Sequence, residues 1–238
     1  MLMDVYKNSF KYDFIKSFKA ATPIVLGYIP LGLASGILSQ KAGLTPLQIG
    51  VLSLFAYAGS GQFITSSMIM ANASILSITL TNFIVNSRSI LMSSALAPYF
   101  KGASKRFLIP FSHGITDETF AINFIKLKDG NWSNRNAILV NLISHVSWIT
   151  SNIIGGITGT IIDIDTVIIN FILTSMFICL LILQIKNKLH ILAAIISGIA
   201  ALSLSMIIKN NLYIIFATII GATICFFIEK SFKKGREN

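Results

Sequence analysis

The sequence predicts an all-α, polytopic integral membrane bundle of seven or eight transmembrane segments, forming one domain over residues 1–238 and allowing for glycine-broken or re-entrant helices. Two observations carry this prediction. Only 12% of the 238 residues are charged while 54% are hydrophobic, whereas soluble domains are about 25% charged. The few charges are also spaced far apart, which excludes an ordinary soluble enzyme and a disordered chain.

The charge-free stretches have the length that a membrane requires. Residues 42–87 form a run of 46 without Asp, Glu, Lys or Arg, and a membrane-spanning helix needs about 20 apolar residues. That run therefore holds about two spans, and five shorter runs hold one each. The predicted spans are residues 18–39, 47–70, 75–97, 137–160, 165–184, 190–208 and 211–229.

An eighth segment is ambiguous. Residues 107–125 are apolar at both ends but carry His113, Asp117 and Glu118 in the middle. If the segment crosses there are eight spans, and if it dips in or lies at the interface there are seven. Cytoplasmic loops are enriched in Lys and Arg, yet both topologies give 13 basic residues inside and 5 outside. Both place the C-terminus in the cytoplasm, and both assign the net charge of +10 to loops and termini rather than to a nucleic-acid site.

Two glycine-rich motifs lie inside the predicted spans. Gly27, Pro30, Gly32 and Gly36 favour either close helix packing or an opened helix that lines a cavity. The run Ala58-Gly59-Ser60-Gly61-Gln62-Phe63 favours either a turn whose amides bind a carboxylate or a polar contact between helices. With His113–Glu118, this run forms a pair of glycine-interrupted segments, which is typical of a transporter site at the membrane midplane.

Three charges are predicted at membrane depth. Arg88 lies well inside a span, where a charge costs about 2.5–3.5 kcal/mol on insertion scales, and Asp117 and Glu118 are the acids available to pair with it. The alternative places both acids in the first turn of an exposed helix capped by Thr116. His113, four residues before Asp117, is a weak metal-ligand candidate without a third ligand, and we expect neither a metal nor a cofactor.

These motifs, in this order, resemble the AzlC family, the large subunit of bacterial branched-chain amino-acid exporters. The resemblance covers about residues 20–188, whereas residues 189–230 match only by hydropathy. It is carried by the motifs at 26–36, 42–47, 58–63, 86–88, 96–99 and 116–121 and by the run from Asp163 to Lys186. Two residues depart from the family pattern: Ser89 stands where a histidine is usual, and Gly61 replaces an alanine.

The resemblance implies a non-enzymatic secondary transporter in the bacterial cytoplasmic (inner) membrane, with a small AzlD-type membrane subunit as partner. The implied substrates are leucine, isoleucine and valine, with methionine as a further candidate. Their export would be driven by a gradient of protons or of another ion. Alternatives are a non-transporting scaffold or assembly subunit, or a permease for a different small solute. The expected substrate-binding residues are Tyr28, Gly59, Ser60, Gly61, Gln62 and Asn86, and the expected coupling residues are Arg88, Asp117 and Glu118.

Overall fold

The computed structural model describes residues 10–161, 171, 174–175, 178, 181–182, 185, 188–207 and 212–234. Every regular element in these ranges is helical, so the predicted all-α class is confirmed. The chain divides into a first unit, residues Met1–Met70 with Val85–Asp163, and a second unit, residues Ala71–Ile84 with Ile164–Asn238.

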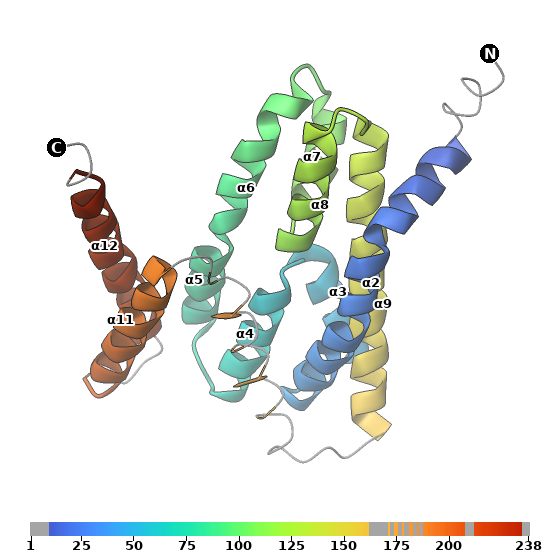
Figure 1. Cartoon of the computed structure of the whole chain (residues 1–238). Helices are drawn as coiled ribbons and strands as arrows, with labels where there is room; N and C mark the ends of the chain where they lie inside the picture. Colours follow the sequence, from blue (N-terminus) through green and yellow to red (C-terminus); the bar gives the residue numbers. More distant parts are fainter. Residues whose placement is uncertain are drawn as a thin grey trace. The chain divides into compact units, whose positions relative to one another are not determined.

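Two long helices, α2 (Phe10–Lys41) and α9 (Asn134–Ile161), form the centre of the first unit. They run parallel, because contacts join their beginnings and also their ends. The Ser17 hydroxyl donates to the Asn136 carbonyl at 3.2 Å, and a Cβ added at Gly159 would meet Gln40 at 3.1 Å. Both helices therefore begin at one end of the unit, called the amino end below, and finish at the other, the carboxyl end (Figure 1).

Glycines allow α2 and α9 to approach closely. A Cβ at Gly32 would lie 2.6 Å from the Ser151 side chain, and one at Gly36 would overlap the Asn152 backbone. Such small residues permit tight packing between membrane helices. Because α2 continues through Pro30 without a break, the packing alternative for this motif is confirmed and the opened helix is wrong.

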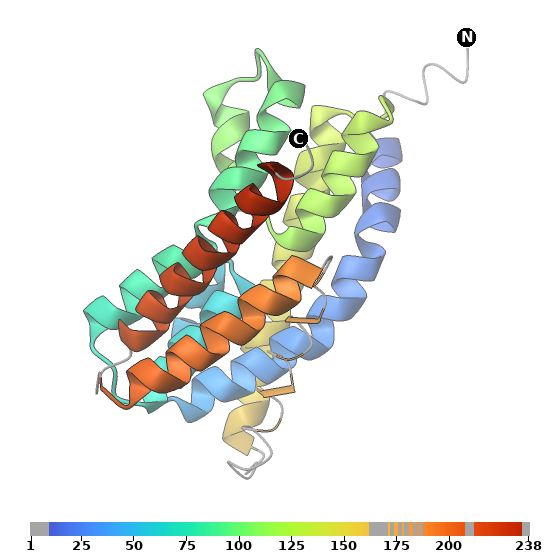
Figure 2. The ribbon, with the colours of Figure 1, turned by 60° about the vertical axis from the view of Figure 1, so that its left-hand side comes forward.

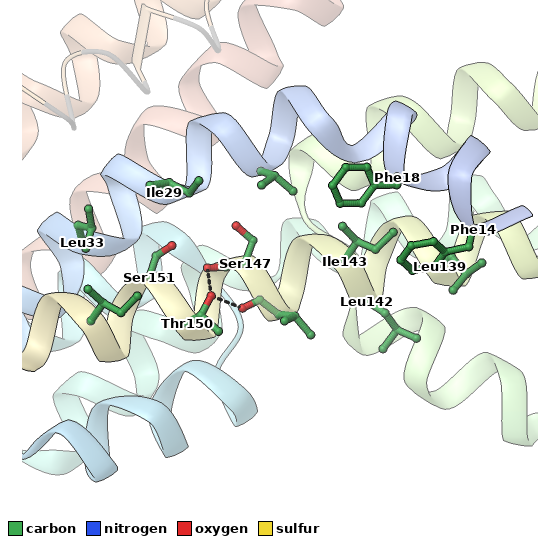
Figure 3. Close-up of a pocket in the computed structure, with 13 residues that line it drawn as sticks. Phe14, Phe18, Ile29, Leu33, Leu139, Leu142, Ile143, Ser147, Thr150 and Ser151 are labelled. Carbon is green, nitrogen blue, oxygen red and sulfur yellow. Dashed lines mark hydrogen bonds between the residues drawn. The ribbon is translucent and has the colours of Figure 1, made fainter. Parts of the chain in front are cut away.

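A shallow apolar groove of about 720 Å³ follows the side of α2 and α9 (Figure 3). Its few hydroxyls include that of Thr150, which bonds back to the carbonyls of Val146 at 2.8 Å and Ser147 at 3.0 Å. None of the predicted site residues lines it. The groove is therefore suited to hydrocarbon and not to a charged solute.

Helices α3 (Pro46–Phe55) and α4 (Gly59–Met70) form a hairpin that returns to the end from which it starts. A capping box between Thr45 and Gln48, with Pro46 in the first turn, begins α3 directly after the end of α2. At the far end of α4, the Ser66 hydroxyl lies 2.8 Å from that of Ser39, near the end of α2. Both arms thus lie at the carboxyl end.

Helices α7 (Lys105–His113) and α8 (Asp117–Lys128) form a second hairpin at the opposite end. Asn141, in the first half of α9, holds both arms. It donates to the Phe111 carbonyl of α7 at 2.9 Å and accepts from Asn123 of α8 at 2.9 Å. Arms of 9–12 residues are roughly 14–18 Å long, about half the hydrocarbon thickness.

These hairpins correct the expected topology. Among the described residues, three helices are long and apolar enough to cross a membrane, namely α2, α9 and the segment Ile75–Phe100. That segment comprises α5 (Ile75–Asn86), α6 (Arg88–Leu96) and the short 3-10 helix η1 (Ala97–Phe100). Residues 47–70 form the two helices α3 and α4, so the interpretation of this segment as one crossing helix is wrong. Residues 107–125 form parts of α7 and α8, which turn back toward the amino end.

The second unit contains α11 (Lys188–Ser205) and α12 (Leu212–Lys234), which lie side by side in Figures 1 and 2. Their contact is close, because a Cβ at Gly221 would overlap the Ser197 hydroxyl. The predicted helices at 190–208 and 211–229 are confirmed, whereas most of the predicted span at 165–184 lies outside the described residues.

Candidate substrate and coupling site

The tip of the first hairpin lies beside the middle of α9. Helix α3 ends at Phe55 and α4 begins at Gly59, so the break falls just before the glycine-rich motif. Gly59, Ser60 and Gly61 form the first turn of α4, and a Cβ added at Gly59 would lie 3.5 Å from the Trp148 ring. Because Gly59 has no side chain, its own backbone is not shielded by one at this point.

Polar groups without partners gather at the start of α4. The first amides of an α-helix have no acceptor within the helix and form its positive end. The Ser60 hydroxyl is buried and lacks a hydrogen-bond partner among the described residues. Orphan donors at a positive helix end are suited to a carboxylate.

Gln62 is fully buried and is held at both ends of its amide. Its Nε2 donates to the Ser53 hydroxyl at 2.8 Å, and its Oε1 accepts from the Trp148 indole N–H. The polar-contact alternative for Gln62 is therefore present in the structure together with the helix break. Gln62 ties both arms of the first hairpin to α9 and so fixes the tip.

The tip of the second hairpin meets the middle of α2. Thr116 caps α8 in a capping box with Thr119, so this helix start is satisfied by the chain itself. The Tyr28 hydroxyl lies 2.8 Å from the Thr116 hydroxyl and donates to the Glu118 carboxylate at 2.8 Å. Tyr28 also packs edge-on against Trp148 and Tyr57, with ring centroids 5.1 and 6.4 Å apart. One tyrosine therefore links both hairpin tips.

Arg88 and Asp117 form an ion pair of 2.8 Å between the starts of α6 and α8. Their side chains are 36% and 46% exposed on this chain. Charges at membrane depth typically face a protein interior or a water-filled cavity rather than lipid. Asn86 ends α5, two residues before Arg88.

The structure places His113 differently from the sequence interpretation. Because the helix breaks at Gly114, His113 and Asp117 belong to different helices and the four-residue spacing does not align them. His113 Nε2 instead lies 2.9 Å from the Leu54 carbonyl. Within the described ranges, no group of three His, Cys, Asp or Glu side chains is arranged to hold a metal.

Sequence reasoning misses several residues of the site. Trp148, Ser53, Tyr57 and His145 are not among the residues that it predicts. A signal exists for Tyr57 and Ser53, which stand on either side of the helix break. No spacing rule connects Trp148 and His145, which are about 90 residues away, to the same point.

Two half-membrane hairpins that meet from opposite ends between crossing helices define a membrane protein of the transporter type. The chain belongs to the AzlC protein family, whose model matches residues 23–162. No solved structure matches the chain.

Three relatives illustrate the similarity. An uncharacterized membrane protein of Helicobacter pylori is 31% identical over 74% of this chain and 79% of its own length. The branched-chain amino acid transport protein AzlC of Bacillus subtilis is 27% identical over 85% and 80%. The inner membrane protein YgaZ of Escherichia coli is 29% identical over 80% and 82%. These relatives support a role in membrane transport.

Proposed function

We propose that this chain is the large subunit of a proton-coupled secondary transporter that exports branched-chain amino acids from the bacterial cytoplasm. The observation that carries the proposal is the meeting of the two hairpin tips between α2 and α9, bridged by Tyr28. The similarity to the branched-chain amino acid transport protein of Bacillus subtilis supports the substrate class. The second subunit is a small AzlD-type membrane protein, and the substrates are leucine, isoleucine and valine, with methionine as a further candidate.

The two tips have opposite electrical character, which suits a zwitterion. The start of α4 offers the amides of Gly59, Ser60 and Gly61 and the Ser60 hydroxyl to the carboxylate of the substrate. The start of α8 carries Asp117 and Glu118, which attract an ammonium group. Tyr28 and Gln62 hold the tips in place, and Asn86 completes the proposed set beside Arg88.

The Arg88–Asp117 pair is the proposed coupling element. Protonation of Asp117 removes the negative charge that neutralises Arg88, so the pair opens and the second tip is released from α6, while Glu118 is proposed as a second coupling carboxylate beside it. An ion pair that breaks on protonation gives the two discrete states that alternating access requires.

The distribution of basic residues along the fold supports one membrane orientation for the proposed transporter. Of the 11 Lys and Arg residues between positions 10 and 161, nine lie toward the amino end, Lys41 lies at the carboxyl end and Arg88 lies between them. The amino end is closed by Lys16 donating to the Asn131 carbonyl at 2.6 Å and by an Arg135–Asp13 pair. Cytoplasmic loops carry the excess of basic residues, so we propose that the amino end of the first unit faces the cytoplasm.

Leucine counterflow tests this function. The full chain is reconstituted in proteoliposomes with and without its small partner, loaded with unlabelled leucine, and supplied with labelled leucine outside. A transporter accumulates the label transiently, and valine and isoleucine compete while an unrelated solute does not. Absence of counterflow in the complete complex would favour the scaffold alternative, and competition by another solute class alone would favour a different permease.

A further inference from the structure

A pair of histidines lies where the two hairpin tips meet α9. His113 ends α7 and His145 belongs to α9, and their ring centroids are 5.4 Å apart. Tyr57, from the first hairpin tip, stacks on His145 at 4.0 Å and lies 6.5 Å from His113. The three rings therefore come from three different elements: α7, α9 and the tip of the first hairpin. These elements separate if the tips move.

Both imidazoles bond to the end of the same helix. His145 Nε2 lies 3.1 Å from the Ser53 carbonyl and His113 Nε2 lies 2.9 Å from the Leu54 carbonyl. A carbonyl oxygen only accepts, so each Nε2 carries the hydrogen, and in the neutral ring Nδ1 is the nitrogen that can bind a proton. The negative end of the α3 dipole favours the cation that this would form.

The short distance between the rings limits how many protons the pair can hold. Two imidazolium ions this close repel each other strongly away from bulk water, so the geometry disfavours a second proton on the pair. The other titratable or charged groups of the surrounding elements are Tyr57 beside the rings, Tyr28 with Glu118 at the second tip, and the Arg88–Asp117 pair. His113 is exposed on this chain and His145 is 8% exposed, so the pair opens to its surroundings through His113.

We propose that His113 and His145 together bind one exchangeable proton and form a further proton-binding site of the transporter, in addition to the acids of the second tip. This deepens the function proposed above and rests on it. One Nδ1 takes a proton from water on one side of the membrane and returns it to water on the other. In the protonated state a charge-assisted bond strengthens the hold of α7 and α9 on the end of α3. In the neutral state this hold weakens, and the Arg88–Asp117 pair acts in series as the second contact of the same tip.

Histidine-selective NMR tests the shared proton directly, because the chain contains only three histidines. The ring nitrogens of the full chain are labelled and titrated in lipid nanodiscs, with His190 of α11 as the internal reference. We expect His113 and His145 to change together and to take up one proton between them, and replacing either by Gln to alter the titration of the other. Two full and independent titrations, or no titration of either ring, would overturn the proposal.

Transport measurements test the role of the pair. In proteoliposomes of the complete complex, His113→Gln and His145→Gln are expected to retain counterflow, since an amide N–H can still donate to the α3 carbonyls. Both should lose leucine accumulation driven by a pH gradient and the accompanying proton flux. His190→Gln is the matched control and should keep both activities.

The outcomes separate the two proposals. Wild-type complex without counterflow contradicts the transport function, whereas the NMR titration still decides whether the pair shares a proton. The histidine site is contradicted if both variants keep counterflow and also keep the proton-driven accumulation of the wild type. That result leaves the transport function standing. A variant that loses counterflow is replaced by His→Asn at the same position, which must then show loss of proton-driven accumulation alone.

Discussion

Gly36 of α2 lies directly against the backbone of Asn152 of α9, with no room between them for a Cβ. This contact holds the two crossing helices together on either side of the point where the hairpin tips meet. Gly27, on the same helix, has nothing within 4 Å of a Cβ position. Substitutions at these two glycines therefore distinguish the effect of close helix packing from the general effect of a glycine inside a helix.

We predict that Gly36→Ala destabilises the protein and that Gly27→Ala does not. Overpacking costs about 1–3 kcal/mol, whereas Ala in place of Gly inside a helix otherwise gains roughly 0.5–1 kcal/mol. Thermal unfolding of the two variants in the same detergent measures the difference. Equal unfolding temperatures would show that the α2–α9 contact is looser than described.

Ser60 and Ser66, one and a half turns apart on α4, give a crossed pair of effects. Ser60 has no hydrogen-bond partner among the described residues, so Ser60→Ala should leave stability unchanged. If the hydroxyl binds the substrate carboxylate, the KM for leucine should rise about tenfold or more, since a bond to a charged group contributes about 1.5–3 kcal/mol. Counterflow at varied leucine concentration measures this change.

Ser66→Ala should do the reverse. It leaves the buried Ser39 hydroxyl without its partner, which costs about 1–3 kcal/mol of stability, but it does not reach the proposed site. Its KM for leucine should stay at the wild-type value. If both variants change KM equally, the effect is structural and Ser60 does not contact substrate.

Asp117→Asn is predicted to abolish proton-coupled efflux while the protein remains folded. The substitution keeps the size of the side chain but leaves Arg88 without its counter-charge. Asp13→Asn, which breaks the pair with Arg135 at the amino end, is the control, and surface pairs of this kind contribute only about 0–1 kcal/mol. Wild-type efflux rates in Asp117→Asn would remove Asp117 from the coupling mechanism.

Single cysteines test the two hairpins. With Cys179 and Cys225 replaced by Ser, we expect Ala103→Cys and Asn131→Cys to react with an impermeant reagent from the cytoplasmic side and Ala42→Cys from the opposite side. The reason is that α7–α8 returns to the amino end, whereas α2 crosses. Labelling of positions 103 and 131 from opposite sides would mean that residues 107–125 cross.

Some of the site followed from local sequence. A helix break near Ala58–Gln62 and one within His113–Glu118 were predictable because glycine and capping residues act on the backbone next to them, although the first break falls just before Gly59 and the glycines form the first turn of α4. The closeness of Arg88 to an acid followed from the cost of an unpaired charge in a membrane. The hydrogen bonds of Tyr28 with Glu118 and of Gln62 with Trp148 could not be predicted from the sequence, because they join residues 90 and 86 positions apart.

The sequence by itself determined that this is an all-α membrane protein with broken helices and few, paired charges at depth, because hydropathy and backbone preference are local properties. Only the tertiary structure decided that residues 47–70 and 107–125 enter and return. Hydropathy records how much apolar chain is available but not the direction in which it runs. That direction depends on the contacts of Ser66 with Ser39 and of Asn141 with Phe111, which hold each hairpin at one end of the parallel α2–α9 pair.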